Sequence, residues 1–172
     1  MKASSFKERF GWLLLPALAV IIALCLNLFV IVNAHIPSSS MSPTIKKDSY
    51  VIGNRLAYLS HSPEKGDIII FRHSELGKKL LIKRVVAVGG DTFAVKDGAV
   101  FVNGEAVTED RANGKTTGEF EEVTVPAGSV IVLGDNRENS NDSRFWDDPF
   151  VGEDDIVAKA FIEYYPKLKK LG

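Results

Sequence analysis

Leu80-Leu81-Ile82-Lys83-Arg84-Val85-Val86-Ala87-Val88 is an apolar run, rich in β-branched residues, with two adjacent cations in its interior. Short apolar runs bounded by Gly, Pro, Asn and Asp are typical of β-strands and lack the 3.6-residue period of a helix. The head group of a lysine in such a strand can be partly desolvated. The run therefore predicts a strand that holds Lys83 in apolar surroundings.

Strands of similar character are predicted along the rest of the chain after Pro43. Asp97-Gly98 separates two of them and is the signature of a tight hairpin, while Pro126-Ala127-Gly128 joins the next two. We therefore expect an all-β domain with a mostly antiparallel sheet. Residues 103–120, polar and rich in Gly and Thr, predict a mobile insertion within it. The other predicted strands cover residues 50–54, 67–71, 92–95, 99–102, 121–125, 130–133 and 157–164.

A long apolar segment precedes this domain. Residues 12–32 carry no formal charge, and as a helix they would span roughly 31 Å, which matches the hydrocarbon core of a bilayer. The flank before the segment is basic, whereas the flank after it has no Lys or Arg until Lys46. The positive-inside rule then places the N-terminus in the cytoplasm. We expect a cytoplasmic tail at 1–11, a transmembrane anchor at 12–33 and an extracytoplasmic β-rich domain at 34–172.

A secretory signal peptide is an alternative interpretation of this segment, with Val32-Asn33-Ala34 as its small-residue cleavage site. The hydrophobic part of a signal peptide is usually about 7–15 residues long. Because the present segment is longer, its length favours a membrane anchor.

The composition excludes several classes of function. A net charge of −1 and an isoelectric point near 6.3 provide no basic field, so we expect no nucleic-acid partner. Cys25, the only cysteine, lies in the apolar segment, which excludes an intrachain disulfide and a thiol nucleophile in the outer domain. The histidines, His35, His61 and His73, have no metal-ligand spacing. We therefore expect neither a metal nor a cofactor.

Ser40 is a candidate nucleophile because it lies just beyond the apolar segment and is followed by Met41, Pro43 and Thr44. A serine hydroxyl needs a base. Lys83 is a candidate base, provided that burial lowers its pKa by several units. Taken singly, each residue has a simpler interpretation: Ser40 as part of a flexible tether, and Lys83 as a surface lysine on an alternating strand.

A third segment favours the catalytic interpretation. It is Gly134-Asp135-Asn136-Arg137-Glu138-Asn139-Ser140-Asn141-Asp142-Ser143-Arg144, and it directly follows an apolar strand. Such a loop can bring Ser140 to a buried ammonium group and fix its own shape through an ion pair between Asp142 and Arg144.

Four segments together resemble the type I signal peptidases, membrane-bound serine proteases that remove signal peptides from exported proteins. The resemblance covers nearly the whole chain and follows the order of the family's motifs after an N-terminal anchor. Gly89, where the family often has proline, and Asp147-Asp148-Pro149, where a glycine is common, depart from the pattern only in loops. The matching segments are Pro37-Ser38-Ser39-Ser40-Met41-Ser42-Pro43-Thr44-Ile45, Gly66-Asp67-Ile68-Ile69-Ile70-Phe71, Lys83-Arg84-Val85 with Gly90-Asp91, and residues 134–144.

The resemblance implies a role for each site residue. Ser40 would be the nucleophile and Lys83 the general base of a Ser-Lys dyad, a variant of the serine protease triad. Ser38 and the backbone N–H of Ser40 would form the oxyanion hole, and Ser140 would orient the lysine. The supporting residues are Asp142 and Arg144, which would hold the loop, Met41 and Pro43, which would shape the approach to the nucleophile, and Asp135 and Asn136, which we expect to be structural.

The resemblance also implies a substrate and a location. The substrates would be signal peptides of translocated preproteins, with small side chains one and three residues before the cut. The chain from Val32 to Ser40 reaches at most roughly 26–29 Å when extended, so cleavage would occur at the outer face of the cytoplasmic membrane. Leu56, Tyr58 and Leu59 are expected either in a surface that contacts membrane lipid or in the core.

Three alternatives make different predictions. A catalytically silent, anchored β-domain that binds exported peptides or a secretion or pilus apparatus would lack Ser40 or Lys83, and both are present. A self-cleaving repressor shares the dyad but needs a DNA-binding domain, for which the anchor leaves no room. An aspartic or metal protease built on Asp135 and Asp142 would need paired motifs or ligands that the sequence lacks.

Overall fold

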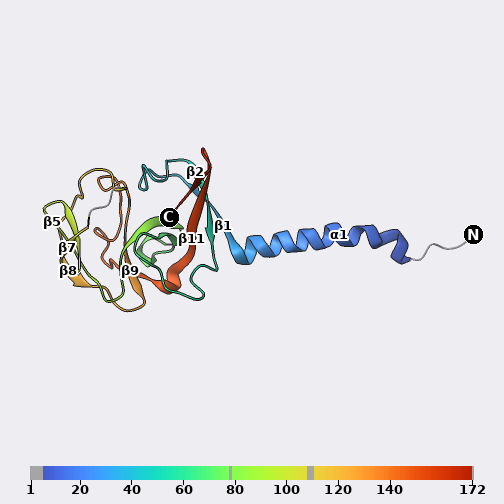
Figure 1. The fold of residues 1–172 in the computed structure, drawn as a ribbon, viewed down its shortest axis with the longest axis horizontal. Helices are drawn as coiled ribbons and strands as arrows, with labels where there is room; N and C mark the ends of the chain where they lie inside the picture. Colours follow the sequence, from blue (N-terminus) through green and yellow to red (C-terminus); the bar gives the residue numbers. More distant parts are fainter. Residues whose placement is uncertain (1–5, 78, 108–110, 172) are drawn as a thin grey trace, which may run out of the picture.

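The chain consists of one long N-terminal helix and a β-domain that follows it (Figure 1). The computed structural model describes residues 6–77, 79–107 and 111–171. Helix α1 (Phe6–Cys25) continues into the π-helical turn η1 (Leu26–Val30). The strands are β1 (Ile31–Ile36), β2 (Ser49–Asn54), β3 (Ile68–Phe71), β4 (Leu81–Val88), β5 (Thr92–Lys96), β6 (Ala99–Val102), β7 (Glu105–Ala106), β8 (Phe120–Thr124), β9 (Ser129–Leu133), β10 (Val151–Gly152), β11 (Ile156–Tyr165) and β12 (Lys169–Lys170), and the short 3-10 helices are η2 (Ser74–Leu76) and η3 (Glu153–Asp155).

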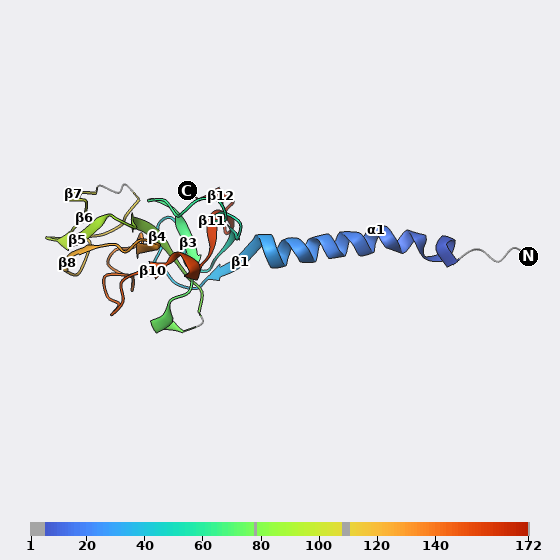
Figure 2. The ribbon, with the colours of Figure 1, turned by 90° about the horizontal axis from the view of Figure 1, so that it is seen from below.

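The described strands form two antiparallel sheets. The larger sheet has the order β1-β2-β11-β3-β4-β9-β10, with β12 beside β11, and the smaller one has the order β7-β6-β5-β8. The small sheet lies at the end of the β-domain that is farthest from α1 (Figures 1 and 2). The prediction of an all-β, mostly antiparallel domain is therefore confirmed.

The two sheets share a hydrophobic core. Val86 of β4 and Ile131 and Leu133 of β9 pack in one cluster with Phe93 and Val95 of the small sheet. All five side chains are almost fully buried, and burial of a side chain of this size stabilises the folded state by about 1.5–3 kcal/mol. The small sheet is therefore docked onto β4 and β9, the strands that lead into the candidate site.

The helix ends earlier than the sequence predicts. Helix α1 begins at Phe6, inside the predicted tail at 1–11, of which residues 1–5 lie outside the described residues. The helical part ends at Val30, three residues before the predicted end of the anchor at 12–33. Ile31–Ile36 is strand β1 because its alternate side chains, Val32, Ala34 and Ile36, are buried in the core. The remaining apolar helix, Trp12–Val30, has 19 residues and is long enough to cross a membrane.

Pairing of β1 with β2 also bears on the alternative of a cleaved signal peptide. Val32 lies opposite Gly53, and Ala34 lies opposite Val51. Cleavage after Ala34 would remove four of the six residues of a strand whose apolar side chains complete the core. The fold therefore supports the interpretation of α1 as an anchor that stays attached.

The two predicted turns differ in what they join. Asp97 and Gly98 both have positive φ, 53° and 76°, as a type I′ hairpin requires. This hairpin joins β5 and β6 as predicted. The turn at Pro126-Ala127-Gly128 instead connects β8 and β9, which lie in different sheets, so it passes the chain from the small sheet to the large one.

The predicted mobile insertion at 103–120 is more structured than expected. Residues 105–106 form β7 and Phe120 begins β8, while 108–110 lie outside the described residues. Thr116 is buried, and Asn113 forms a parallel β-bridge with Asn136. A polar composition suggested a solvated loop, but these polar groups bond to other parts of the protein.

The packing between β2 and β11 can be tested by a substitution at Gly53. A Cβ added there would lie 2.9 Å from the Cβ of Ala158 and 3.0 Å from Cδ1 of Ile70. We expect Gly53→Val to lower the free energy of unfolding by about 1–3 kcal/mol because it overpacks the core. Denaturant unfolding of the detergent-solubilised chain measures this. Ile52→Val, at a less buried position of the same strand, is the matched control and should lower the free energy of unfolding by less. Equal losses of stability in the two variants would contradict the close packing of β2 against β11.

Candidate active site

Ser40 lies in a turn that directly follows β1. The N–H of Ser42 donates to the carbonyl of Ser39 at 3.0 Å, and the N–H of Ile45 donates to the carbonyl of Met41 at 2.8 Å. Met41 and Ile45 are fully buried in the core beneath β1 and β2. The turn is therefore fixed to the β-domain and is not a flexible tether.

The structure assigns Met41 a different place from the one that we expected. We expected Met41 and Pro43 to shape the approach to the nucleophile. Met41 has no exposed surface, so its side chain anchors the turn from inside the core. Pro43 is exposed and stays a candidate for the approach.

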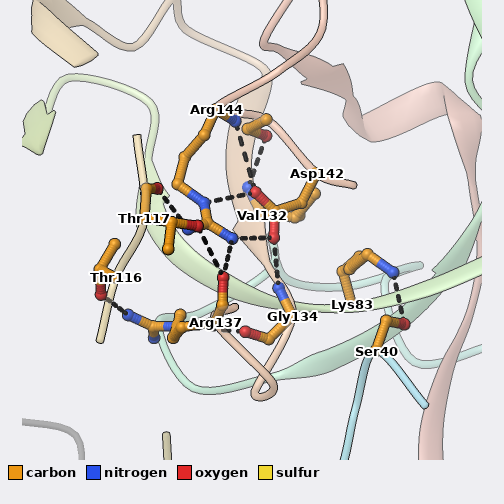
Figure 3. A network of polar contacts seen from close by, with 10 residues as sticks. Ser40, Lys83, Thr116, Thr117, Val132, Gly134, Arg137, Asp142 and Arg144 are labelled. Carbon is orange, nitrogen blue, oxygen red and sulfur yellow. Dashed lines mark hydrogen bonds and ion pairs between the residues drawn. The ribbon is translucent and has the colours of Figure 1, made fainter. Parts of the chain in front are cut away.

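Lys83 lies within hydrogen-bonding distance of Ser40. Its strand, β4, lies between β3 and β9 in the large sheet. The amine Nζ of Lys83 donates to Oγ of Ser40 at 2.8 Å (Figure 3). It also donates to the carbonyl of Ile82 at 3.2 Å. Both side chains are buried, with 5% of Lys83 and 6% of Ser40 exposed. The structure thus brings these two candidate residues into hydrogen-bond contact.

Burial changes the acid–base behaviour of Lys83. Loss of hydration lowers the pKa of its amine to about 8, while the carboxylates of Asp142 and Asp135 act in the opposite direction and the Arg144 guanidinium lowers it slightly further. With this pKa, roughly a tenth of the lysine is neutral at pH 7, against less than a thousandth for an ordinary lysine. The buried amine can therefore accept a proton from Ser40 near neutral pH.

A second hydroxyl lies beside the nucleophile. Oγ of Ser38 is 3.2 Å from Oγ of Ser40, and the Ser38 side chain is on the exposed side of the turn. A hydroxyl there can donate to an oxyanion that forms on a carbonyl bound at Ser40. This position is compatible with the oxyanion-hole role that we expect for Ser38.

Two residues of the loop at 134–144, Gly134 and Ser140, lie close to the nucleophile Ser40. A Cβ added to Gly134 would collide with Oγ of Ser140 and would lie 2.5 Å from the carbonyl oxygen of Ser40. Only a glycine leaves room for these two groups, a requirement that the sequence analysis missed. Among the described residues, Ser140 Oγ has no hydrogen-bond partner although it is buried. The lysine-orienting role of Ser140 stays a prediction.

The loop is locked by the ion pair that the sequence predicts. Nε of Arg144 donates to Oδ1 of Asp142 at 2.8 Å, and Nη2 donates to Oδ2 at 2.9 Å. The same Oδ2 accepts the backbone N–H of Gly134 at 2.9 Å (Figure 3). Both charged side chains are buried, and a buried charge pair of this kind fixes geometry more than it adds stability.

A second buried ion pair joins β4 to the loop. Arg84, the neighbour of Lys83, donates from Nε and Nη2 to the two carboxylate oxygens of Asp135 at 2.8 and 2.7 Å. Its Nη1 donates to the carbonyl of Gly66 at 2.7 Å. The expected structural role of Asp135 thus has a physical basis, because this pair fixes the loop relative to the strand of the base.

A cavity lies beside Ser38 and Lys83. Its volume is about 220 Å³, and its walls come from the end of β1 and the start of β4, with Ile70 at its base. Strand β1 is the edge of the large sheet, and the pairing of β9 with β4 starts only at Arg84. Both walls therefore have backbone groups that an extended peptide can pair with. The lining residues are Ala34, His35, Ile36, Pro37, Ser38, Ile70, Lys79, Leu80, Leu81, Ile82 and Lys83.

This arrangement is suited to nucleophilic acyl transfer. A serine hydroxyl is bonded to an amine of lowered pKa, and a hydroxyl donor lies beside it at the end of a peptide-sized cavity. Within the part of the chain that the structure describes, no group of His, Cys, Asp or Glu side chains could hold a metal ion. The hydrogen-bonded hydroxyl and amine have the arrangement that a serine hydrolase with a lysine base requires.

Comparison with known proteins identifies the family. Residues 9–165 match the family model described as "Signal peptidase, peptidase S26". A probable signal peptidase I-2 of Synechocystis is 35% identical over 153 residues, which cover 86% of this chain and 69% of that protein. Signal peptidase I of Leptolyngbya laminosa is 35% identical (90% and 80% covered), and that of Bacillus caldolyticus is 36% identical (92% and 91%). The chain belongs to the signal peptidases of the S26 family.

The lowered pKa of Lys83 predicts a measurable effect on stability. Below about pH 8 the folded protein holds a buried ammonium, and as the pH rises toward 10.5 only the unfolded chain keeps this proton. The contribution of Lys83 to the free energy of unfolding is therefore unfavourable at pH 7 and improves with rising pH. Lys83→Met should be the more stable protein at pH 7, and its advantage should shrink by about 2 kcal/mol at pH 10.

Denaturant unfolding at the two pH values measures the difference. Lys79→Met, which removes an exposed lysine at the mouth of the cavity, is the control and should show little pH-dependent change. If the difference in the free energy of unfolding between wild type and Lys83→Met were the same at both pH values, the amine would titrate as an ordinary lysine.

Proposed function

We propose that the chain is a serine endopeptidase that removes N-terminal signal peptides from exported preproteins, with Ser40 as nucleophile and Lys83 as general base. The observation that carries the proposal is the 2.8 Å hydrogen bond between Lys83 Nζ and Ser40 Oγ, in a site where burial lowers the lysine pKa. Family membership supplies the class of substrate.

The reaction begins with acylation of the enzyme. Oγ of Ser40 attacks the scissile carbonyl carbon while neutral Lys83 takes the hydroxyl proton. Ser38 Oγ and the backbone N–H of Ser40 donate to the oxyanion. Collapse of the tetrahedral intermediate breaks the C–N bond, and the Lys83 ammonium protonates the amine of the departing mature protein.

Hydrolysis of the ester completes the cycle. The signal peptide is now bound through its C-terminal carbonyl to Oγ of Ser40. A water molecule gives a proton to Lys83 and attacks this carbonyl, and the ammonium then returns the proton to Oγ as the signal peptide leaves. The buried amine thus acts twice as a base and twice as an acid, which requires a pKa close to the working pH.

The cavity supports an extended substrate with small side chains near the cut. Its volume is about 220 Å³, and β1 and the start of β4 present backbone groups on either side of it. A peptide in the β-conformation directs alternate side chains to the same face. Residues one and three positions before the cut would then enter the cavity together, in agreement with the preference for small residues that the family resemblance implies.

The helix and the surface beside it support action at the membrane. The basic flank before the helix and the absence of Lys and Arg from residues 33–45 support a cytoplasmic N-terminus and an extracytoplasmic β-domain. Next to the end of η1, a mainly apolar cavity of about 430 Å³ is lined by Val30, Ile31, Leu56 and Phe161, among others. With the exposed Leu56 and Leu59, this surface is suited to contact with membrane lipid.

Substitution of either dyad residue tests the proposal. Ser40→Ala and Lys83→Ala should each lower the cleavage of a preprotein with an Ala-X-Ala site by at least about a thousandfold, because neither group can act without the other. Gel analysis of cleavage by the detergent-solubilised chain measures this, and unchanged circular dichroism shows that the variants fold. Retained cleavage in either variant would refute the dyad. Tight binding of signal peptides by a wild-type protein that never cuts them would support the silent binding domain instead.

The pH dependence of cleavage provides a second test. Because the base must be neutral, kcat/KM should rise about tenfold per pH unit in the acidic range and level off above about pH 8, the pKa of Lys83. An ordinary lysine would let the rate climb well beyond pH 9. A profile that still rises at pH 10 would contradict the lowered pKa.

A further inference from the structure

The segment Asn113–Thr117, here called the strap, lies along the loop that carries Ser140. The N–H of Asn113 donates to the carbonyl of Asp135 at 2.7 Å, and the N–H of Arg137 donates to the carbonyl of Asn113 at 3.0 Å. These two bonds bracket Asn136, with which Asn113 forms a parallel bridge. The strap therefore acts as an additional short strand beside the loop.

Asn136 faces the nucleophile on its other side. Its backbone N–H donates to the carbonyl of Ser40 at 3.0 Å, and its side-chain Nδ2 donates to the carbonyl of Ser39 at 3.1 Å. The strap, the loop and the nucleophile segment are thus hydrogen-bonded in series. The strap comes from the segment between β7 and β8, so this series links the small sheet to the catalytic serine.

The strap also provides acceptors for two buried guanidinium groups. Nη1 of Arg137 donates to Oγ1 of Thr116 at 3.3 Å, and Nη1 of Arg144 donates to the carbonyl of Thr117 at 2.8 Å (Figure 3). The hydroxyl of Thr117 donates to the carbonyl of Arg137 at 3.3 Å. Arg137 and Arg144 are buried, and a buried cation that loses an acceptor must move or be hydrated.

The series of bonds determines the direction of the oxyanion donor. The carbonyl of Ser39 and the N–H of Ser40 belong to one planar peptide group, so an acceptor bond to the first fixes where the second points. Asn136 makes this bond to Ser39 in addition to the bond from the N–H of Ser42, and the strap holds Asn136 from its other side. We propose that the strap is a positioning element, which sets the Ser39–Ser40 peptide in the orientation that the transition state requires. This proposal rests on the proposed function.

The test uses a pair of substitutions at one strap position. Thr116→Val removes the hydroxyl that accepts from Nη1 of Arg137, with little change of shape, whereas Thr116→Ser keeps it. The bond from Nε of Arg137 to the carbonyl of Gly134 is retained in both. Lys115→Ala is the matched control, because Lys115 is exposed and its backbone N–H, which donates to Glu138, is retained. Cleavage of an Ala-X-Ala preprotein by the full detergent-solubilised chain is measured as kcat and KM between pH 6 and 10.

We expect Thr116→Val to lower kcat about tenfold at every pH, because misplacement of catalytic groups by a fraction of an ångström is sufficient for such a loss. KM should change little, and the inflection of the pH profile should stay near the pKa of Lys83, about 8. Thr116→Ser and Lys115→Ala should behave as wild type. A general loosening of the site would instead move the inflection toward the value of an ordinary lysine.

A second variant covers the case in which Thr116→Val does not fold. Gly114 has a φ of 82°, and a Cβ there would lie 2.9 Å from the side chain of Glu138. Gly114→Ala therefore displaces the strap without removing any of its hydrogen-bonding groups, and should also lower kcat. Wild-type kcat in folded Thr116→Val and Gly114→Ala would overturn the proposal. Failure of the wild type itself to cleave would refute the proposed function and not the strap alone.

Discussion

Burial of the Lys83 amine beside the Ser40 hydroxyl is the constraint on which the rest of the site depends. An amine accepts a proton only in its neutral form, and loss of hydration on β4 favours that form. The same burial removes water that would otherwise solvate the ammonium formed during the reaction. The remaining hydrogen bonds of Lys83, to Ser40 and to the carbonyl of Ile82, therefore have to stabilise both protonation states.

Two of the buried cations around the lysine are paired with carboxylates. Arg84 is paired with Asp135, and Arg144 is paired with Asp142. The carboxylates raise the pKa of Lys83 and the Arg144 guanidinium lowers it, which leaves burial as the dominant cause of the shift. The Arg84–Asp135 pair connects the loop to β4, and the Asp142–Arg144 pair holds the shape of the loop itself. The charged groups that surround the lysine are therefore also the groups that fix the geometry.

Much of the candidate site was predictable because its chemistry depends on residue types in a short stretch. Ser40, Lys83 and the pair Asp142–Arg144 were predicted, and the structure brings each pair into contact. The roles of Gly134 and of the strap were not, since they depend on neighbours distant in sequence: Gly134 must leave space for Ser40 and Ser140. Strands β7, β10 and β12, with two residues each, are too short to leave a periodic pattern.

The sequence by itself determined the all-β class, the apolar anchor and the residue types of the dyad, because these follow from local composition and from motifs. Only the tertiary structure decided where the anchor ends, since Ile31 and Val32 suit a helix and a strand equally, and pairing with β2 selects the strand. It also decided that Lys83 is buried and that the polar strap contacts the loop at 134–144. Burial and long-range hydrogen bonds are properties of the assembled sheets, and no short segment contains them.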